Sequence, residues 1–166
     1  MLQPLWQWLE NTELAQFVAS SDWAFPTLET LHVIFIVTVI GSIAIVDLRL
    51  LGVTGRNQSV TSLSRDTLPL TWVAFGFALI TGLLLFASKA TQYMVNPYFI
   101  TKIALIVLAG INMLVLHFVN WKDVSNWDNG TVPTAVKVAG GLSLTFWIIV
   151  IFCGRMIGFT LGIYHT

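Results

Sequence analysis

The sequence contains few charged residues. Asp, Glu, Lys and Arg make up 10% of its 166 residues and apolar residues make up 56%, whereas soluble domains are about one quarter charged. The formal net charge is zero, so the charge balance gives no indication of a nucleic-acid partner. One cysteine, Cys153, excludes an intrachain disulfide and a metal site built from cysteines alone. This composition predicts a single membrane domain over residues 1–166.

The common catalytic motifs are missing as well. The chain has no P-loop, no nucleophile elbow, no His-Glu-x-x-His motif and no paired cysteines. The polar stretches between its apolar segments are too short to form a catalytic domain. We therefore assign no catalytic residues and expect any chemistry to occur within the membrane, by passage of electrons or protons.

Four long apolar segments each approach the ~20 residues that a helix needs to cross a bilayer. They cover approximately residues 28–51, 68–88, 99–119 and 138–164. None shows the alternation of barrel strands, and a helix satisfies its own backbone in lipid. Because the connections are short, we expect an all-α, integral membrane four-helix bundle with antiparallel neighbours.

Residues 1–25 precede the first span and have neither a basic region nor a cleavage site typical of a signal peptide. Their apolar residues recur at helical spacing. Trp6 and Trp8 are suited to the headgroup level of a bilayer. The segment is predicted to be an amphipathic helix that lies in the membrane interface.

The distribution of basic residues predicts the orientation. The region before the first span contains acidic residues but no Lys or Arg. Basic residues instead follow the first and third spans: Arg49, Arg56, Arg65, Lys122 and Lys137. By the positive-inside rule, both termini lie outside and the two longer loops lie in the cytoplasm.

Ionisable residues at membrane depth are costly and often functional. Here they form two layers along the predicted helices. The outer layer contains Glu29, His32, Lys89, Lys102 and Arg155, and the inner layer contains Asp47, Arg49, Arg65, Asp66 and His117. The simplest alternative to a function is a set of structural ion pairs, for example Glu29 with Arg155 or Lys102.

The two histidines within the spans suggest a cofactor. His32 and His117 lie near opposite edges of the apolar core, at depths that differ by roughly 20 Å along the helices. They cannot easily bind one metal, but their spacing suits two haems stacked across a membrane. We therefore treat His32 and His117 as candidate iron ligands of haem b, with up to two haems per chain. The other candidate cofactor-binding residues are Lys102, Arg155, Glu29, Arg49 and Asn112.

Two features support a haem. Lys102 and Arg155 share the depth of His32 and could pair with haem propionates. Glycines in the spans would let a flat macrocycle approach closely. Gly154, Gly158 and Gly162 form a GxxxGxxxG run in the fourth span, which is typical of close packing against a helix of the same chain or of a second copy. A homo-oligomer, either a dimer or a trimer, is a candidate assembly in the lipid bilayer.

Several segments resemble one protein family. Residues 25–32 read FPTLETLH, residues 46–52 read VDLRLLG and residues 81–87 read TGLLLFA. Together with Asn96-Pro97, Lys102, Asn112 and His117, they resemble a family of bacterial four-span membrane proteins that is defined by sequence rather than by activity. The resemblance implies a location in the bacterial inner (cell) membrane.

A looser likeness, in architecture only, is to membrane b-type cytochromes, which hold each haem between two histidines. This chain departs from that pattern because each histidine-bearing span has a single histidine. A haem here would be five-coordinate or would take a methionine, His165 or a ligand from another subunit.

Three hypotheses follow. The first is a b-type haem protein that transfers electrons within or across the membrane, with a quinone or a redox protein as a candidate partner. It would be an electron-transfer protein rather than a catalyst with its own substrate. The second is a non-catalytic scaffold or accessory subunit. The third is a small proton or cation transporter that uses Glu29, His32, Asp47 and His117.

Overall fold

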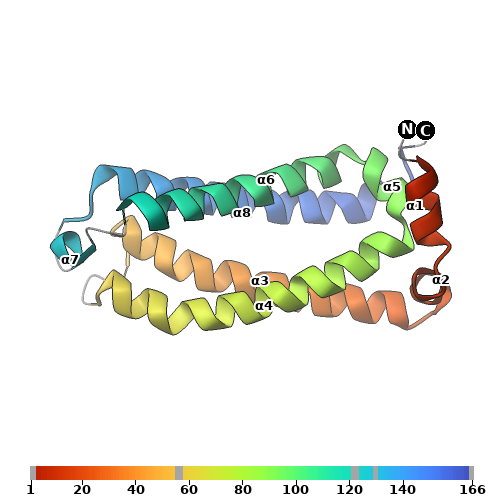
Figure 1. Ribbon diagram of the computed structural model, residues 1–166, viewed down its shortest axis with the longest axis horizontal. Coiled ribbons are helices and arrows are strands. Elements are labelled where there is room, and N and C mark those ends of the chain that lie inside the picture. Colours follow the sequence, from red (N-terminus) through yellow and green to blue (C-terminus); the bar gives the residue numbers. More distant parts are fainter. Residues whose placement is uncertain (1–2, 55–57, 121–123, 129–130, 165–166) are drawn as a thin grey trace.

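The structure is a computed structural model that describes residues 3–54, 58–120, 124–128 and 131–164. Within these ranges it contains helices and no strand. Figure 1 shows the helices, which are α1 (Gln3–Glu10), α2 (Glu13–Ser20), α3 (Ala24–Leu50), α4 (Val60–Ser88), α5 (Ala90–Val95), α6 (Pro97–Val115), a π-helical turn (Leu116–Asn120), α7 (Val124–Trp127) and α8 (Thr134–Thr160). The predicted all-α fold is confirmed.

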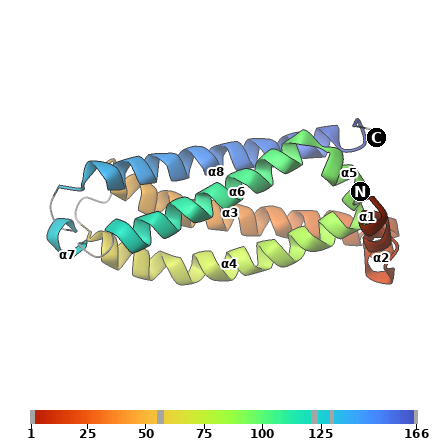
Figure 2. The same ribbon diagram turned by 45° about the horizontal axis from the view of Figure 1, so that its top comes forward.

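The long helices form two antiparallel pairs, α3 with α4 and α6 with α8, and the pairs meet where α3 packs on α8. Helices α1, α2 and α5 gather with both chain ends at one end of the bundle, whereas α7 lies at the other (Figure 1). We name these the outer end and the inner end, after the topology expected from the sequence. Helix α3 diverges from α8 towards the outer end in both views, whereas α4 approaches α5 and α6 there, where Phe86 stacks on Phe99 (Figures 1 and 2).

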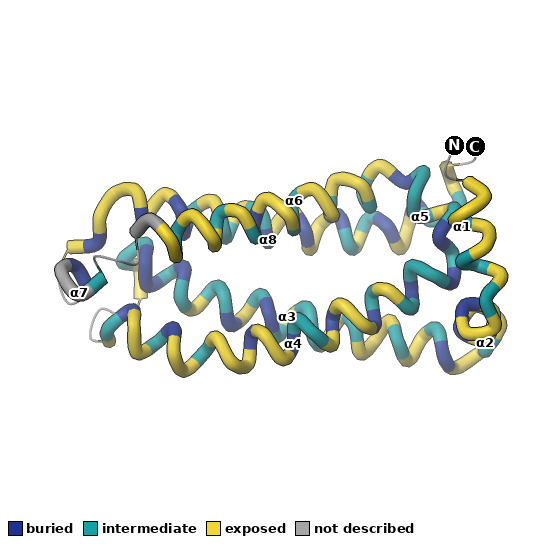
Figure 3. The backbone as a smooth tube through the Cα atoms, in the orientation of Figure 1, coloured by how far each residue is buried: buried dark blue, intermediate teal, exposed yellow. Residues whose placement is uncertain are grey.

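Four helical segments of the described chain are long and apolar enough to cross a membrane: Ala24–Leu50, Val60–Ser88, Pro97–Phe118 and Thr134–Thr160. Figure 3 shows exposed residues along the outward faces of all four. Many are large apolar side chains, including Trp72, Ile80 and Ile148. Such continuous apolar surfaces suit lipid chains rather than water. The protein is therefore a multi-pass membrane protein.

The second and fourth spans have different limits from those expected. Helix α4 begins at Val60 because the Ser59 hydroxyl caps it, accepting a hydrogen bond from the Ser62 N–H at 3.1 Å. The helix continues through Pro69 without interruption. Helix α8 ends at Thr160 rather than near residue 164, because Leu161 is extended and Gly162 has a φ of +87°. A left-handed residue of this kind ends a helix.

The N-terminal segment forms two short helices rather than one. Thr12 separates them, because its extended backbone ends the first helix and its hydroxyl caps the second at Ala15. Helix α1 is fixed to α5 by the Glu10 carboxylate, which accepts hydrogen bonds from the Thr91 N–H at 2.8 Å and the Thr91 hydroxyl at 2.7 Å. Trp6 also contacts Phe86 of α4 edge-on, with ring centroids 5.8 Å apart.

Buried apolar side chains form two clusters. The first, to which every long helix contributes, consists of Val39, Ala74, Ala109, Trp147 and Val150 at mid-depth. The second lies near the inner end and consists of Leu50, Val60, Trp127, Val132 and Val136. The mid-depth cluster fills the bundle between the polar groups of the outer half and those of the inner half. The two halves are therefore separate chemical environments.

Candidate functional site

The outer half of the bundle holds His32 in a fixed orientation. Its Nδ1 atom lies 3.0 Å from the Ala78 carbonyl oxygen and 3.1 Å from the Thr81 Oγ1 atom, both on α4. The Thr81 hydroxyl itself donates to the Phe77 carbonyl at 2.8 Å. Because a carbonyl oxygen can only accept, Nδ1 carries a proton, and in the neutral form of the ring Nε2 then carries the lone pair.

The His32 ring lies against Gly82. A Cβ atom at Gly82 would be 2.9 Å from the Cε1 atom of His32, which is closer than non-bonded carbon atoms approach. The glycine therefore provides the space that the imidazole occupies between α3 and α4. The sequence predicts that glycines in the spans permit the close approach of a macrocycle, and at Gly82 the group that approaches is a side chain of the protein itself.

Lys102 lies beside this histidine, on α6. It is partly buried, and its positive charge acts on the His32 imidazole. Its Nζ atom would lie 3.9 Å from a Cβ atom at Gly154 of α8. In the part of the chain that the structure describes, no carboxylate pairs with this ammonium group. Lys102 is thus a cation in the membrane interior without an acidic partner from the described chain.

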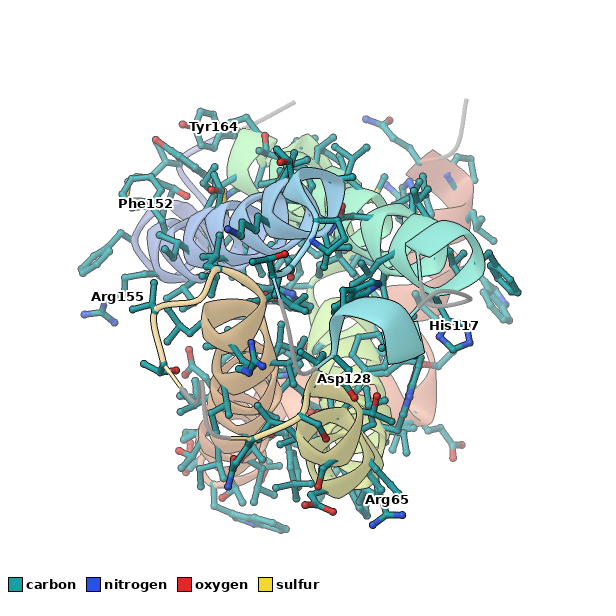
Figure 4. The ribbon with its side chains drawn as sticks, turned by 90° about the vertical axis from the view of Figure 1, so that its left-hand side faces the viewer. Arg65, His117, Asp128, Phe152, Arg155 and Tyr164 are labelled. Carbon is teal, nitrogen blue, oxygen red and sulfur yellow. The ribbon has the colours of Figure 1, made fainter. Side chains whose placement is uncertain are left out.

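Glu29 and Arg155 share the depth of His32 and Lys102 but differ from them in exposure. Both are exposed, and Figure 4 shows Arg155 at the periphery of the bundle. The guanidinium of Arg155 lies 4.5 Å from the centre of the Phe159 ring, a cation–π contact within α8. The expected ion pair of Glu29 with Arg155 or Lys102 is not formed among the described residues.

His117 is also outside the bundle interior. Its side chain is exposed in the π-helical turn that follows α6 and contacts Phe118 edge-on at 5.6 Å. Figure 4 shows it at the periphery of the bundle. The two histidines occupy opposite halves of the bundle, as their sequence positions indicate, but only His32 lies between helices.

Arg49 closes the inner end of the bundle and is only 4% exposed. Its Nε atom donates to the Gln58 carbonyl at 2.8 Å, and its Nη2 atom donates to the Asp128 carbonyl at 3.1 Å. The Asp128 carboxylate accepts from the Thr61 N–H at 3.2 Å and from the Thr61 hydroxyl at 2.6 Å. Figure 4 shows Asp128 near the middle of this end. This Arg49–Asp128–Thr61 network joins α3, α4 and the segment after α7.

Asn112 joins α6 to α8. Its Nδ2 atom donates to the Ala139 carbonyl at 2.9 Å. This is the interhelical hydrogen bond expected of an amide in the middle of a span. The side-chain amide of Asn112 is therefore already hydrogen-bonded within the protein.

The three glycines of the α8 run have different surroundings. Gly154 faces Lys102, whereas no atom lies within 4 Å of the position of a Cβ at Gly158. Gly162 lies beyond the helix, in the left-handed conformation. The run does not form one continuous face within the chain. Gly158 is exposed and leaves room for a helix of a second copy, so the homo-oligomer stays a prediction.

An aromatic cluster covers the outer end. Phe86 stacks on Phe99 with centroids 5.4 Å apart, and Tyr93 of α5 lies 6.1 Å from Phe86 and 5.2 Å from Phe99. Burial raises the pKa of the Tyr93 phenol to about 12, and the negative charge of Glu29 adds to the shift. Tyr93 is therefore a neutral hydrogen-bonding group at physiological pH.

Comparison of the chain with protein-family models, with curated proteins and with solved structures finds no match. The resemblance to four-span bacterial proteins accordingly stays an expectation. The class of the protein is defined by its fold: it is a multi-pass, all-α membrane protein. Its function has to be inferred from the groups described above.

Proposed function

We propose that the protein is a b-type haem protein that transfers electrons within the bacterial cell membrane, and that His32 is the residue that would hold the haem iron in the outer half of the bundle. The observation that carries this proposal is the anchoring of the His32 Nδ1–H by the Ala78 carbonyl. Metal-ligating histidines are typically oriented by such a hydrogen bond from the other ring nitrogen. The bond leaves Nε2 of the neutral ring with its lone pair available for iron.

The residues around His32 suit a haem in further respects. Lys102 offers an ammonium group without an acidic partner in the described chain, and an interior cation of this kind is stabilised by a carboxylate such as a propionate. Because Gly154 has no side chain, the surface of α8 beside Lys102 leaves room for a bound group. When bound, a haem iron supplies one-electron redox chemistry, whose potential depends on axial ligation, burial and hydrogen bonding. The protein would fix the ligand and exclude water.

The proposal is limited to one haem per chain. His117 and Arg155 are exposed, and the guanidinium of Arg49 is engaged in hydrogen bonds at the inner end. Asn112 is engaged with Ala139. These residues do not lie around His32, so they form no part of the proposed haem site. Electron transfer would take place between this haem and a partner at the outer side, for which a quinone or a redox protein is a candidate.

The orientation is part of the proposal. Arg49, Arg65 and Lys137 all lie towards the inner end, whereas both chain ends lie at the outer end. By the positive-inside rule the inner end is cytoplasmic. Alkaline phosphatase fused to the C-terminus should be active, because this enzyme folds only outside the cytoplasm. An inactive fusion that is present at normal abundance would reverse the orientation.

Absorption spectra of the purified protein test the haem. After expression with ample haem, the wild-type protein should show a Soret band and, on reduction, sharp visible bands. His32→Ala should lose them, because iron loses its ligand from the chain. Added imidazole should restore part of the Soret band in that variant, since a free ligand can occupy the vacated space.

His117→Ala is the matched control, because its imidazole lies outside the bundle interior, and its spectrum should equal that of the wild type. A colourless wild-type protein that remains folded by circular dichroism would rule out the haem. Retention of the full spectrum in His32→Ala would rule out His32 as the ligand. The first result would favour a scaffold or accessory subunit, whereas the second would mean that another residue holds the haem.

A further inference from the structure

Asp47 is a buried acid in the inner half of the bundle, on α3. Its side chain is 5% exposed. The Oδ2 atom has no hydrogen-bond partner among the described residues, and it is the one buried side-chain nitrogen or oxygen atom there in that condition. Buried polar groups in proteins are nearly always satisfied. An unsatisfied carboxylate oxygen at membrane depth therefore indicates a missing ligand.

The basic residues nearest to Asp47 in the sequence do not neutralise the charge of its carboxylate. On α3 itself, Arg49 directs its guanidinium to the Gln58 and Asp128 carbonyls. Among the described residues, the charged and titratable groups on the other elements packed at this end are Arg65 and Asp66 on α4, Lys137 on α8, His117 in the π-helical turn and Asp128 after α7. The first four are exposed, and Asp128 is bonded to Thr61. Within the described chain, no basic group pairs with the Asp47 carboxylate.

One polar group does face Asp47. The side chain of Ser143, on α8, lies near its carboxylate. The two helices are in close contact at this point, since a Cβ atom at Gly140 would lie 3.3 Å from the Asp47 carbonyl oxygen and 3.2 Å from the Cβ atom of Leu50. The surroundings are otherwise apolar, because Leu50 and Val136 belong to the inner buried cluster.

We propose that Asp47 and Ser143 form a binding site for a small monovalent cation, either a proton or a sodium ion, in the inner half of the membrane. A carboxylate alone in hydrocarbon is strongly destabilised, and both ligands remove its net charge. The Ser143 hydroxyl supplies a second oxygen to either cation. The site is distinct from that of His32, because 15 residues of helix separate them by roughly 22 Å at about 1.5 Å per residue. It rests on no part of the haem proposal.

Labelling with dicyclohexylcarbodiimide tests this site on the wild-type protein, without any substitution. The reagent is apolar and forms an adduct with protonated carboxyl groups. In a sodium-free choline buffer, mass spectrometry should find the adduct on Asp47, and its yield should fall as the pH rises. Asp66, which is exposed at the same end of the bundle, is the internal control and should be labelled several-fold less.

Sodium then distinguishes the two cations. If the site binds sodium, added NaCl should decrease the labelling of Asp47 several-fold and KCl at the same concentration should not. If the site binds only a proton, the two salts should have equal effects. Absence of an Asp47 adduct throughout the pH range in choline buffer, or labelling no greater than that of Asp66, would overturn the proposal.

Two variants complete the test. Asp47→Asn should lose the adduct while keeping the helical circular dichroism spectrum and any haem absorption, which separates this proposal from the preceding one. Ser143→Ala should change the pH or the sodium concentration at which labelling is half-maximal, because a ligand to the carboxylate is removed. Identical labelling curves for Ser143→Ala and wild type would exclude Ser143 from the site.

Discussion

Basic residues lie in both halves of the bundle, but they differ in how fully they are hydrogen-bonded or paired. In the inner half, the buried guanidinium of Arg49 has two carbonyl acceptors, and its partner residue Asp128 is bonded in turn to Thr61. In the outer half, Lys102 has no acidic partner in the described chain, and one ring nitrogen of His32 is used while the other is not. The inner network closes the structure, whereas the outer groups retain capacity to bind.

This difference follows from how the helix pairs meet. Helices α3 and α8 are close at the inner end, where Gly140 lets them touch, and they diverge towards the outer end (Figures 1 and 2), although α4 and α6 meet there through Phe86 and Phe99. Polar groups at a close contact can satisfy one another. In the outer half, where α3 and α8 separate, Lys102 has no acidic partner in the described chain and depends on water, lipid or a ligand. Asp47 is the exception in the inner half, and for that reason it carries a proposal of its own.

Replacement of Arg49 by Ala should produce the largest effect. It removes two charge-assisted hydrogen bonds and leaves the Gln58 and Asp128 carbonyls without this donor, so the free energy of unfolding should decrease by about 3 kcal/mol. Thermal unfolding in detergent, followed by circular dichroism, measures the change. Arg65→Ala removes an exposed guanidinium of α4 and should change the stability by no more than about 0.5 kcal/mol. Equal effects of the two substitutions would contradict a structural inner network.

Gly82→Ala should disturb the outer half. The added Cβ would lie 2.9 Å from the Cε1 atom of His32, so the ring must move and its bond to the Ala78 carbonyl must lengthen. Overpacking of this kind costs about 2 kcal/mol. On the haem proposal, the Soret band should also shift or weaken.

Gly76→Ala is the matched control on the same helix. No atom lies within 4 Å of the corresponding Cβ position. Because alanine favours a helix over glycine by up to about 1 kcal/mol, this variant should be as stable as wild type or slightly more so. A wild-type spectrum and melting temperature for Gly82→Ala would contradict the packing of His32 on Gly82.

The sequence predicts the depth of polar residues well but not the direction in which they point. The number of spans, the antiparallel order and the two layers all follow from apolar length and connection length. Arg155 shares the expected depth of His32, yet its side chain faces outward. In the inner half, the side chain of His117 also faces outward. Because these helices are apolar on nearly all sides, no stripe in the sequence identifies the packed face.

Two other features of the structure could not be predicted from the sequence. The anchor of His32 is the carbonyl of Ala78, and a backbone acceptor is the same at every residue. Asp128 looks like an ordinary polar loop residue, although it is 8% exposed and bonded to Thr61. The N-terminal break at Thr12, in contrast, has a signal: threonine followed by Glu13 is typical of a helix N-terminus. That signal would have predicted two helices instead of one.

The phenol of Tyr93 tests the outer end by pH. Its pKa is raised from 10.0 to about 12, so above pH 10 the unfolded state releases the proton while the folded state keeps it. The folded state is then less stable as pH rises from 10 to 12, by at most about 2 kcal/mol. Tyr93→Phe keeps the ring but does not titrate, so its melting temperature should fall less over this range. Parallel curves for the two proteins would indicate that Tyr93 is open to water.

Asn112→Ala should have the smallest effect, because it removes a single hydrogen bond between α6 and α8. Interhelical hydrogen bonds within membranes contribute about 0.6 kcal/mol on average, since each group also finds partners in the unfolded chain. The Ala139 carbonyl keeps its place in helix α8, so no acceptor is left unpaired by the change. The expected decrease in melting temperature is therefore small and independent of pH, haem and sodium. A loss comparable to that of Arg49→Ala would mean that the single α6–α8 hydrogen bond contributes as much to stability as the inner network.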